Sequence, residues 1–413
     1  MSAGLPEAQP GWRRALVLSL LALGALIAYL DRTSLSVVLA VEDFRKLFRL
    51  TDTDRGFLNA AFFFSYALLQ IPAGWLVDRK GVRRPYAAGF LLWGLASAAT
   101  SLAASAAQLF GLRVLLGVGE SIVAPASMRW IRFNFPEQQR GFAVAIYLAG
   151  IGAGLALGAP ATAALVSTHG WQTMFLTLGL GSLLWLIPWM ALATEGNPRV
   201  DAASNAAGDE STAFRHALGN PALAGAILGT FSYNYFLYFS MTWMPAYLVE
   251  RRGLSLNSMG FYLMLGFGGL TWIAVCAGWL ADRLIAAGRS PIQVRKGFAI
   301  AGLLLGSSEI LATQVSSQAA ALFFVVFSLT GLGLASANCW ALTHSLAPGP
   351  VIGRIIGLQN FVANAAGILA PIVTGWLKQT TSSYDSPFLA VWVCLLAGVA
   401  SYTVLVREPT GEK

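Results

Sequence analysis

The sequence predicts an all-α polytopic membrane protein, with twelve transmembrane helices in two pseudo-symmetric six-helix bundles. Three observations support this prediction: an apolar composition, a series of apolar stretches of membrane-spanning length, and an internal repeat. Hydrophobic residues make up 56% of the 413 residues and charged residues only 11%, whereas about 25% of the residues of a soluble protein are charged. A chain this apolar cannot hide its hydrophobic surface from water by folding on itself, so a lipid bilayer is its expected environment.

Twelve apolar stretches are long enough to cross a membrane, because a helix of about 20 residues spans about 30 Å of hydrocarbon. The first six lie near residues 15–40, 56–77, 86–105, 109–131, 142–166 and 173–193. The other six lie near residues 222–249, 258–281, 297–316, 320–345, 353–377 and 387–406. Within the fifth stretch, Gly150, Gly154 and Gly158 recur at a spacing of four, which favours close packing of helix backbones.

A short string of residues is repeated at about half the chain length. Ala73–Arg79 reads AGWLVDR, and Ala277–Arg283, 204 residues later, reads AGWLADR. A repeat with this period predicts two copies of one helical bundle, each ending a helix at the same face of the membrane. The expected domains are an N-terminal bundle at 1–194 and a C-terminal bundle at 221–413, joined by a polar cytoplasmic linker at 195–220.

The positions of lysine and arginine orient the helices, because short cytoplasmic loops hold an excess of both. With both termini in the cytoplasm, eighteen of these residues lie in inner segments and seven in outer loops. The net charge of +8 therefore reflects membrane orientation and does not support a nucleic-acid partner. Arg13 and Arg14 precede an apolar run that is too long for a signal peptide, so a retained first helix is expected. The expected location is the cell inner (plasma) membrane, with many spans in contact with lipid.

The repeated string carries a resemblance to a known family. Gly74–Arg84 resembles the loop signature between the second and third helices of the major facilitator superfamily, and the copy at Gly278 is similar to its second-half equivalent. The second copy departs from the pattern by a longer spacing before Arg289. We expect the charges of these turns to pair between helix ends across the two halves; solvated loop charges are the alternative. The residues expected to form this conformational gate are Gly74, Asp78, Arg79, Gly278, Asp282 and Arg283.

Four other stretches resemble one branch of that superfamily, the anion:cation symporter family, which includes bacterial hexonate, hexuronate and aldarate transporters and is related to sialin and vesicular glutamate carriers. These stretches are Tyr29–Arg32, Tyr66 with Gln70–Pro72, Gly111–Pro125 and Tyr238–Leu248. The resemblance implies that Asp31 and Glu120 handle protons. It also implies that Arg32 and Arg113 serve substrate binding and coupling.

Four charged residues inside predicted spans stand out, namely Asp31, Arg32, Arg113 and Glu120. An ionised side chain at the bilayer centre costs about 2.5–3.5 kcal/mol on insertion scales, so each should face a cavity or a partner. Arg113 and Glu120 are seven residues apart and therefore share one helix face. The guanidinium of Arg32 suits carboxylate capture, because its planar fork donates two parallel hydrogen bonds. A purely structural salt bridge with Glu120 or Asp31 is the alternative, and both states fit different steps of one cycle.

Neutral polar residues are candidates for the wall of a binding cavity. Tyr66 and Gln70 are one helical turn apart, as are Asn360 and Asn364, so each pair presents hydrogen-bonding groups along one stripe. Interhelical ties within the bundle are the alternative for both pairs. Tyr238 belongs to an aromatic cluster that could gate the cavity or simply pack. Glu309, in the ninth span, is expected to face lipid or a nearby loop rather than to take part in transport.

The resulting hypothesis is a secondary active transporter that takes up a small organic anion, such as a sugar acid, together with protons by alternating access. A proton-linked multidrug exporter of the same fold is the alternative, which Arg32 and Arg113 disfavour. A sensor that binds the ligand without moving it is a further alternative. An enzyme is not expected, because the three histidines are scattered and no nucleotide-binding loop occurs. No catalytic residue, cofactor or metal is expected, and the protein is expected to function as a monomer.

Overall fold

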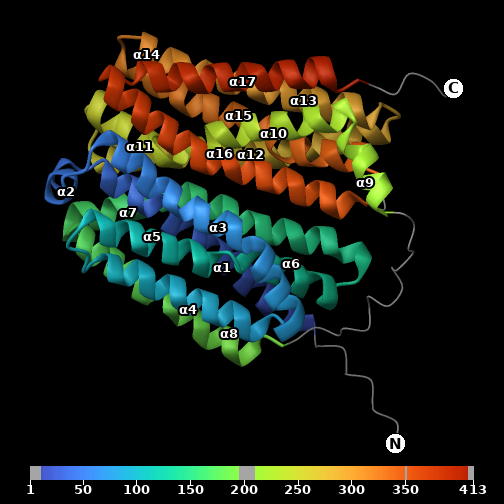
Figure 1. Cartoon of the computed structure of the whole chain (residues 1–413), viewed down its shortest axis with the longest axis horizontal. Coiled ribbons are helices and arrows are strands. Elements are labelled where there is room, and N and C mark those ends of the chain that lie inside the picture. The colour runs from blue at the N-terminus through green and yellow to red at the C-terminus, as the bar shows by residue number, and fades with distance from the viewer. Residues whose placement is uncertain (1–10, 195–209, 349–350, 408–413) are drawn as a thin grey trace, which may run out of the picture. The chain divides into compact units, whose positions relative to one another are not determined.

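The computed structural model describes residues 11–194, 210–348 and 351–407 (Figure 1). All the regular secondary structure within these residues is helical. Several helices begin where the sequence offers a side chain that caps the free backbone N–H groups of the first turn. These N-caps are Ser105, Asn220, Ser255, Ser290 and Ser317, each of which accepts a hydrogen bond from a backbone N–H two or three residues later.

The first six spans are built from helices between residues 11 and 192. They are α1 (Gly11–Leu39), α3 (Asp52–Lys80), α4 (Arg83–Thr100), α5 (Ala106–Glu120) continued by α6 (Val123–Asn134), and α7 (Glu137–Ser182) continued by η1 (Leu183–Trp185) and α8 (Leu186–Leu192). A short helix, α2 (Glu42–Phe48), separates α1 from α3. The long α7 holds two spans, because Gly170 has a φ of 80° and a non-helical ψ of 168° that break it.

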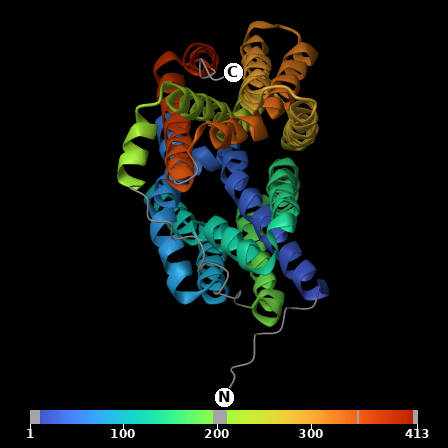
Figure 2. The ribbon, with the colours of Figure 1, turned by 90° about the vertical axis from the view of Figure 1, so that its right-hand side faces the viewer.

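The second six spans follow the short helix α9 (Glu210–Leu218). They are α10 (Pro221–Thr242) continued by α11 (Met244–Ala246) and η3 (Tyr247–Arg251), α12 (Leu256–Ala286), α13 (Pro291–Gly306) continued by η4 (Ser307–Ile310) and α14 (Leu311–Gln314), α15 (Gln318–Leu346), α16 (Ile352–Thr381) and α17 (Asp385–Leu405). Within this set, α15 packs against α12 and α13, and α10 packs against α16 and α17 (Figure 2).

The described helices carry the surface of a membrane protein. By length and composition, nine of them could span a membrane. Division of Glu137–Leu192 at Gly170, together with α4 and α10, completes the expected twelve spans. Large apolar side chains such as Ile71, Phe142 and Trp272 are exposed, which is favourable where the surrounding solvent is lipid. The prediction of an all-α polytopic fold is confirmed.

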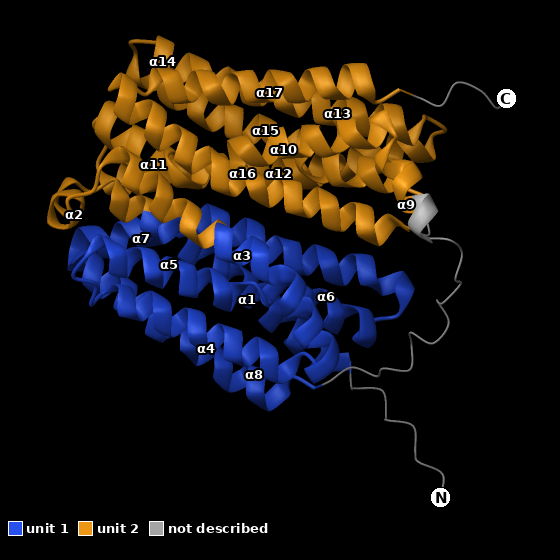
Figure 3. Ribbon diagram, viewed as in Figure 1, with its two compact units in different colours: residues 1–35, 64–206 blue, residues 36–63, 207–413 orange. Residues whose placement is uncertain are grey.

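The chain forms two compact units, each described separately (Figure 3). Unit 1 contains residues 1–35 and 64–206, and unit 2 contains residues 36–63 and 207–413. Residues 36–63 thus pack with the second half of the chain, although they precede the first copy of the repeat. The expected linker at 195–220 falls largely outside the described residues. Its last part forms α9, where Ala217 packs against Leu223 and Ile355.

Within unit 1, the three spaced glycines of α7 bring its backbone against α1. A Cβ atom added at Gly150 would lie 2.1 Å from the carbonyl oxygen of Ala22, and one added at Gly154 would lie 2.5 Å from that of Leu26. Real Cβ atoms do not approach backbone so closely, so only glycine fits at these positions. The packing that the glycine spacing predicts is therefore present.

Candidate functional site

The centre of unit 1 holds a buried ion pair between two spans. Arg32, on α1, donates from Nε to Oε2 of Glu120, on α5, at 2.8 Å. Arg32 is 5% exposed and Glu120 is fully buried. The two helices place these charges deep in the bundle, where each charge offsets the desolvation cost of the other. The ion pair between Arg32 and Glu120, which the sequence analysis gave as an alternative to substrate binding by Arg32, is thus formed in this structure.

Two tyrosine rings flank the guanidinium of Arg32. Its central carbon lies 4.3 Å from the ring centroid of Tyr29 and 4.6 Å from that of Tyr66. Both distances are within the range of a cation–π contact, which gains strength where water is scarce. Tyr29 comes from α1 and Tyr66 from α3. Two aromatic rings close to the guanidinium restrict its orientation.

Asp31 points away from its neighbour Arg32 and is held by α4. The indole Nε1 of Trp93 donates to Oδ2 of Asp31 at 2.6 Å, and the Ser97 hydroxyl donates to Oδ1 at 3.2 Å. The sequence interpretation did not include Trp93 or Ser97. Their spacing of four places them on one helix face, but nothing in the sequence indicates that this face is turned toward α1.

Glu120 retains one unused acceptor. Its Oε1 is buried and accepts no hydrogen bond from the described residues. Arg113, two turns earlier on α5, is 4% exposed and lies within electrostatic range of Glu120 and Asp31. A buried carboxylate with an open oxygen can take up a proton or a ligand hydroxyl there. The structure therefore brings Asp31, Arg32, Arg113 and Glu120 into one polar region of unit 1.

The neutral candidates are divided between the two units. Gln70 lies one turn below Tyr66 on α3 in unit 1, whereas Tyr238, Asn360 and Asn364 belong to unit 2. The Asn364 side chain donates from Nδ2 to the Asn360 carbonyl oxygen at 2.9 Å, a bond within its own helix. The ring of Tyr238 lies 4.5 Å from that of Phe63. In this state, Tyr238 thus packs against another aromatic side chain of unit 2.

The repeated turns have matching surroundings in the two units. Asp78 pairs with Arg129 at 2.5 Å in unit 1, and Asp282 pairs with Arg295 at 3.6 Å in unit 2. A Cβ atom on Gly74 would lie 4.0 Å from a side-chain carbon of Pro125, and one on Gly278 would lie 4.0 Å from that of Ala337. Each of these two ion pairs lies within one unit. The expected pairing of these charges across the halves stays a prediction.

The arginine of each turn lies over a tryptophan ring four residues earlier on the same helix. The distance to the ring centroid is 4.3 Å for Arg79 over Trp75 and 4.0 Å for Arg283 over Trp279. Asp78 and Asp282 each pair with an arginine of another helix, and not with the arginine of their own turn, among the ion pairs of the described residues. The string repeated in the sequence is therefore also a repeated structural unit.

Glu309 is fully buried in η4 of unit 2. Neither of its carboxylate oxygens accepts a hydrogen bond from a described residue. The prediction that it faces lipid is wrong, although it does lie close to the loop that precedes α15. The hydrophobic pattern of the sequence does not predict which way Glu309 points, because the ninth span changes from α-helix to 3₁₀-helix at Ser307–Ile310. Among the described residues, no three His, Cys, Asp or Glu side chains are grouped closely enough to hold a metal ion.

Comparison with known proteins identifies the family of this chain. The model of the Major Facilitator Superfamily matches residues 21–371. The D-galactonate transporter of Escherichia coli O6:H1 is 29% identical, over 99% of this chain and 99% of that protein. The hexuronate transporter of Bacillus subtilis is 27% identical, over 94% and 92%.

The fold has close counterparts among solved structures. A bacterial homolog of the human lysosomal transporter Spinster superposes with a TM-score of 0.82, at 18% identity and over 97% of this chain and 98% of that one. Its fold agrees with the twelve spans described above. The chain belongs to the major facilitator superfamily, a family of multi-pass membrane transporters.

Proposed function

We propose that the protein is a secondary active transporter that imports a small organic anion, a sugar acid or related carboxylate, together with protons. The observation that carries the proposal is the buried pair of Arg32 and Glu120, flanked by aromatic rings and with one acceptor left open. The printed names of the relatives, transporters of D-galactonate and of hexuronates, support the substrate class.

In the proposed cycle, the substrate carboxylate replaces Glu120 as the partner of Arg32. The guanidinium keeps an anionic partner throughout, so the exchange avoids an unpaired buried cation. Glu120, left without its cation in a region of low dielectric, then takes up a proton. Asp31 is the second proton-handling group, and Arg113 couples the two carboxyl groups. Binding and protonation are thereby linked through one arginine.

The neutral side chains are proposed to recognise the hydroxyl groups of the substrate. Tyr66 and Gln70 contribute from the first half, and Tyr238, Asn360 and Asn364 contribute from the second. The halves at 1–194 and 221–413 would rock around the substrate within one monomer, with the linker and both termini in the cytoplasm of a bacterial inner membrane. The turns at Asp78 and Asp282 would stabilise one end state of that motion.

Counterflow into proteoliposomes tests the proposal. Labelled D-galactonate should accumulate in vesicles preloaded with unlabelled galactonate, and an imposed proton gradient should drive net uptake. Glu120→Gln should keep counterflow but lose gradient-driven accumulation, since an amide cannot carry the proton. Glu137→Gln, at the start of α7, is the matched control and should behave as the wild type.

A second arm separates the exporter alternative. If a labelled lipophilic cation exchanges and no carboxylate does, the protein is an exporter of the same fold and the anion proposal fails. Full proton-driven accumulation by Glu120→Gln would remove Glu120 from the coupling step.

A further inference from the structure

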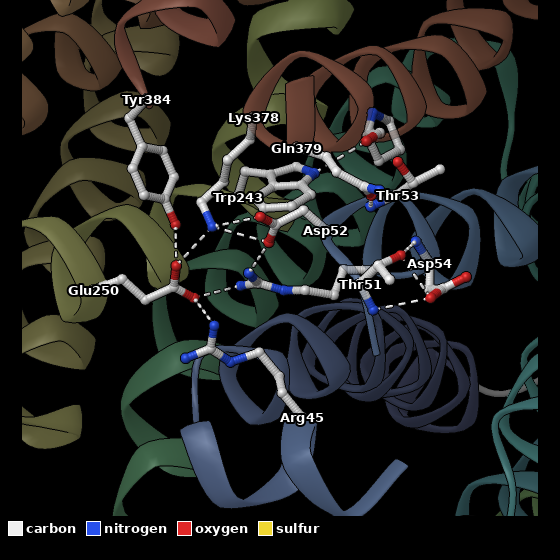
Figure 4. Close-up of polar contacts among 12 residues, drawn as sticks. Arg45, Thr51, Asp52, Thr53, Asp54, Trp243, Glu250, Lys378, Gln379 and Tyr384 are labelled. Carbon is white, nitrogen blue, oxygen red and sulfur yellow. Dashed lines mark hydrogen bonds and ion pairs between the residues drawn. The ribbon is translucent and has the colours of Figure 1, made fainter. Parts of the chain in front are cut away.

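Unit 2 contains a second cluster of charges, distinct in its residues from the pair of Arg32 and Glu120 (Figure 4). We call it the outer cluster, because the orientation predicted from lysine and arginine places these segments outside. Its members are Arg45, Asp52, Arg55, Glu250, Lys378 and Tyr384. They come from α2, α3, η3, α16 and the residue before α17. Residues far apart in sequence thus converge on one place.

Glu250 is the centre of the outer cluster. Its Oε1 lies 2.7 Å from Nη2 of Arg55 and 3.1 Å from Nη1 of Arg45. Its Oε2 lies 3.0 Å from Nζ of Lys378 and accepts a hydrogen bond from the Tyr384 hydroxyl at 2.7 Å. One carboxylate therefore contacts three cations and a phenol, which are donors of the kind that bind carboxylate ligands.

The cluster has more cations than carboxylates. Asp52, the other acid, pairs with Arg55 at 2.6 Å and with Lys378 at 2.9 Å. Arg55 is 1% exposed and lies over the ring of Trp243, with 4.6 Å to the centroid. The buried Nε of Arg45 donates no hydrogen bond to a described residue. Three cations share two carboxylates, so the site retains an excess of one positive charge and one open donor.

The cluster joins residues from both halves of the sequence. Arg45, Asp52 and Arg55 lie in the 36–63 segment, whereas Glu250 and Lys378 lie after the linker. Backbones meet closely beneath them: a Cβ atom on Gly56 would lie 2.5 Å from the Pro371 carbonyl oxygen. A state in which the whole 36–63 segment leaves η3 and α16 would take Arg45, Asp52 and Arg55 away from Glu250 and Lys378. After such a separation, the 36–63 segment would hold two arginines, Arg45 and Arg55, and one carboxylate, that of Asp52.

We propose that Arg45, Arg55 and Lys378 form an outer docking site for the carboxylate of an arriving anion, which Glu250 occupies as an internal substitute when the outer side is closed. The inference rests on the proposed import of an organic anion. An arriving carboxylate competes with Glu250 for the same donors, so opening replaces one charge-assisted contact by another. The docking site draws anions toward the transporter, and neutral polyols gain nothing from it.

The first test follows access to the buried residue Asn59, which lies one turn after Arg55 and donates from Nδ2 to the Arg55 carbonyl oxygen at 3.0 Å. Asn59→Cys is introduced together with Cys276→Ser, Cys339→Ser and Cys394→Ser, and labelled in right-side-out vesicles by a membrane-impermeant maleimide. D-Galactonate should speed labelling, whereas galactitol, which has no carboxylate, should not. When Glu250→Gln is added to this variant, the introduced cysteine should be labelled fast even without ligand. Galactonate should then raise the labelling rate by less than about twofold, because the internal carboxylate is already absent.

The second test measures transport from each side, so it does not depend on the cysteine variant. Arg45→Gln should raise the KM for galactonate entering from outside about fivefold, and leave the KM for exit and the kcat within about twofold. Lys46→Gln is the matched control on the same helix, because Lys46 pairs only with the exposed Glu42 among the described residues. It should match the wild type at both faces.

The outcomes separate the two proposals. If wild-type protein carries galactonate but Glu250→Gln labels no faster than its parent, the docking site is wrong and the proposed import stands. The same holds if Arg45→Gln changes the KM equally at both faces, or not at all, or if galactitol speeds labelling as galactonate does. If the wild type carries no carboxylate, both proposals fail.

Discussion

Arg32 combines an ion pair at Nε with two aromatic rings that lie close to its guanidinium, those of Tyr29 and Tyr66. A flat guanidinium can stack on aromatic rings, and its fork of donors fits a carboxylate. An ammonium group provides the charge but neither the plane nor the fork. The proposed recognition of an anion by Arg32 would therefore depend on the shape of the cation as well as on its charge.

The first prediction concerns this shape. Arg32→Lys keeps a cation opposite Glu120, so the protein should fold, but the KM for a sugar acid should rise at least about tenfold, or about 1.4 kcal/mol. Counterflow at several substrate concentrations measures it. Arg13→Lys, earlier on α1, is the control, because Arg13 binds only the Leu192 and Ala191 carbonyl oxygens among the described contacts. An unchanged KM in Arg32→Lys would argue against substrate contact.

At the scale of the element, α7 depends on the small side chains of its inner face. Gly150 meets the backbone of α1 and leaves no room for a methyl group, whereas Gly141, at the start of the same helix, has no neighbouring atom within 4 Å of an added Cβ. The same residue type thus has two roles in one helix. One glycine is required by packing, and the other only lowers helix propensity.

The second prediction compares these two glycines. Gly150→Ala should lower the unfolding temperature in detergent, because overpacking against backbone costs about 1–3 kcal/mol. Gly141→Ala should leave it unchanged or raise it slightly. Thermal unfolding monitored by intrinsic fluorescence of both variants measures the difference. Equal unfolding temperatures would mean that α1 and α7 can move apart without cost.

At the scale of the molecule, the proposed closure of the outer cluster should not respond to the protons of the proposed symport. Burial alone would raise the pKa of the Glu250 carboxyl, but Arg55, Lys378 and the Tyr384 hydroxyl outweigh burial and hold the pKa below its usual range. A lowered pKa means that the ion pairs are fully present above the ordinary glutamate value of about 4.3 and are lost only as the pH falls below it. The third prediction follows from this sign.

Labelling of the Asn59→Cys variant without ligand should therefore be constant, after correction for thiol ionisation, between about pH 8 and pH 5. It should rise only at lower pH, where Glu250 takes up a proton. The Glu250→Gln background serves as control, since it has no carboxyl to titrate and should label at one rate throughout. A rise centred near pH 6 would show that Glu250 titrates in the transport range.

The sequence predicted the fold well, because apolar length and the internal repeat are local properties that a bilayer translates directly into spans. It also singled out Arg32 and Glu120, since charges are rare inside spans. It did not identify Trp93, Ser97 or Arg129, because their roles depend on which face a helix turns to its neighbour. For the same reason it assigned residues 36–63 to the first half, whereas the structure packs them with the second.

The break at Gly170 has a consequence for how the chain enters the membrane. A single non-helical residue, Gly170, turns the chain between the fifth and sixth spans, so no long loop separates them. We therefore expect the two spans to insert into the membrane together, as one helical hairpin, and not one after the other. An epitope tag inserted after His169 should therefore block assembly.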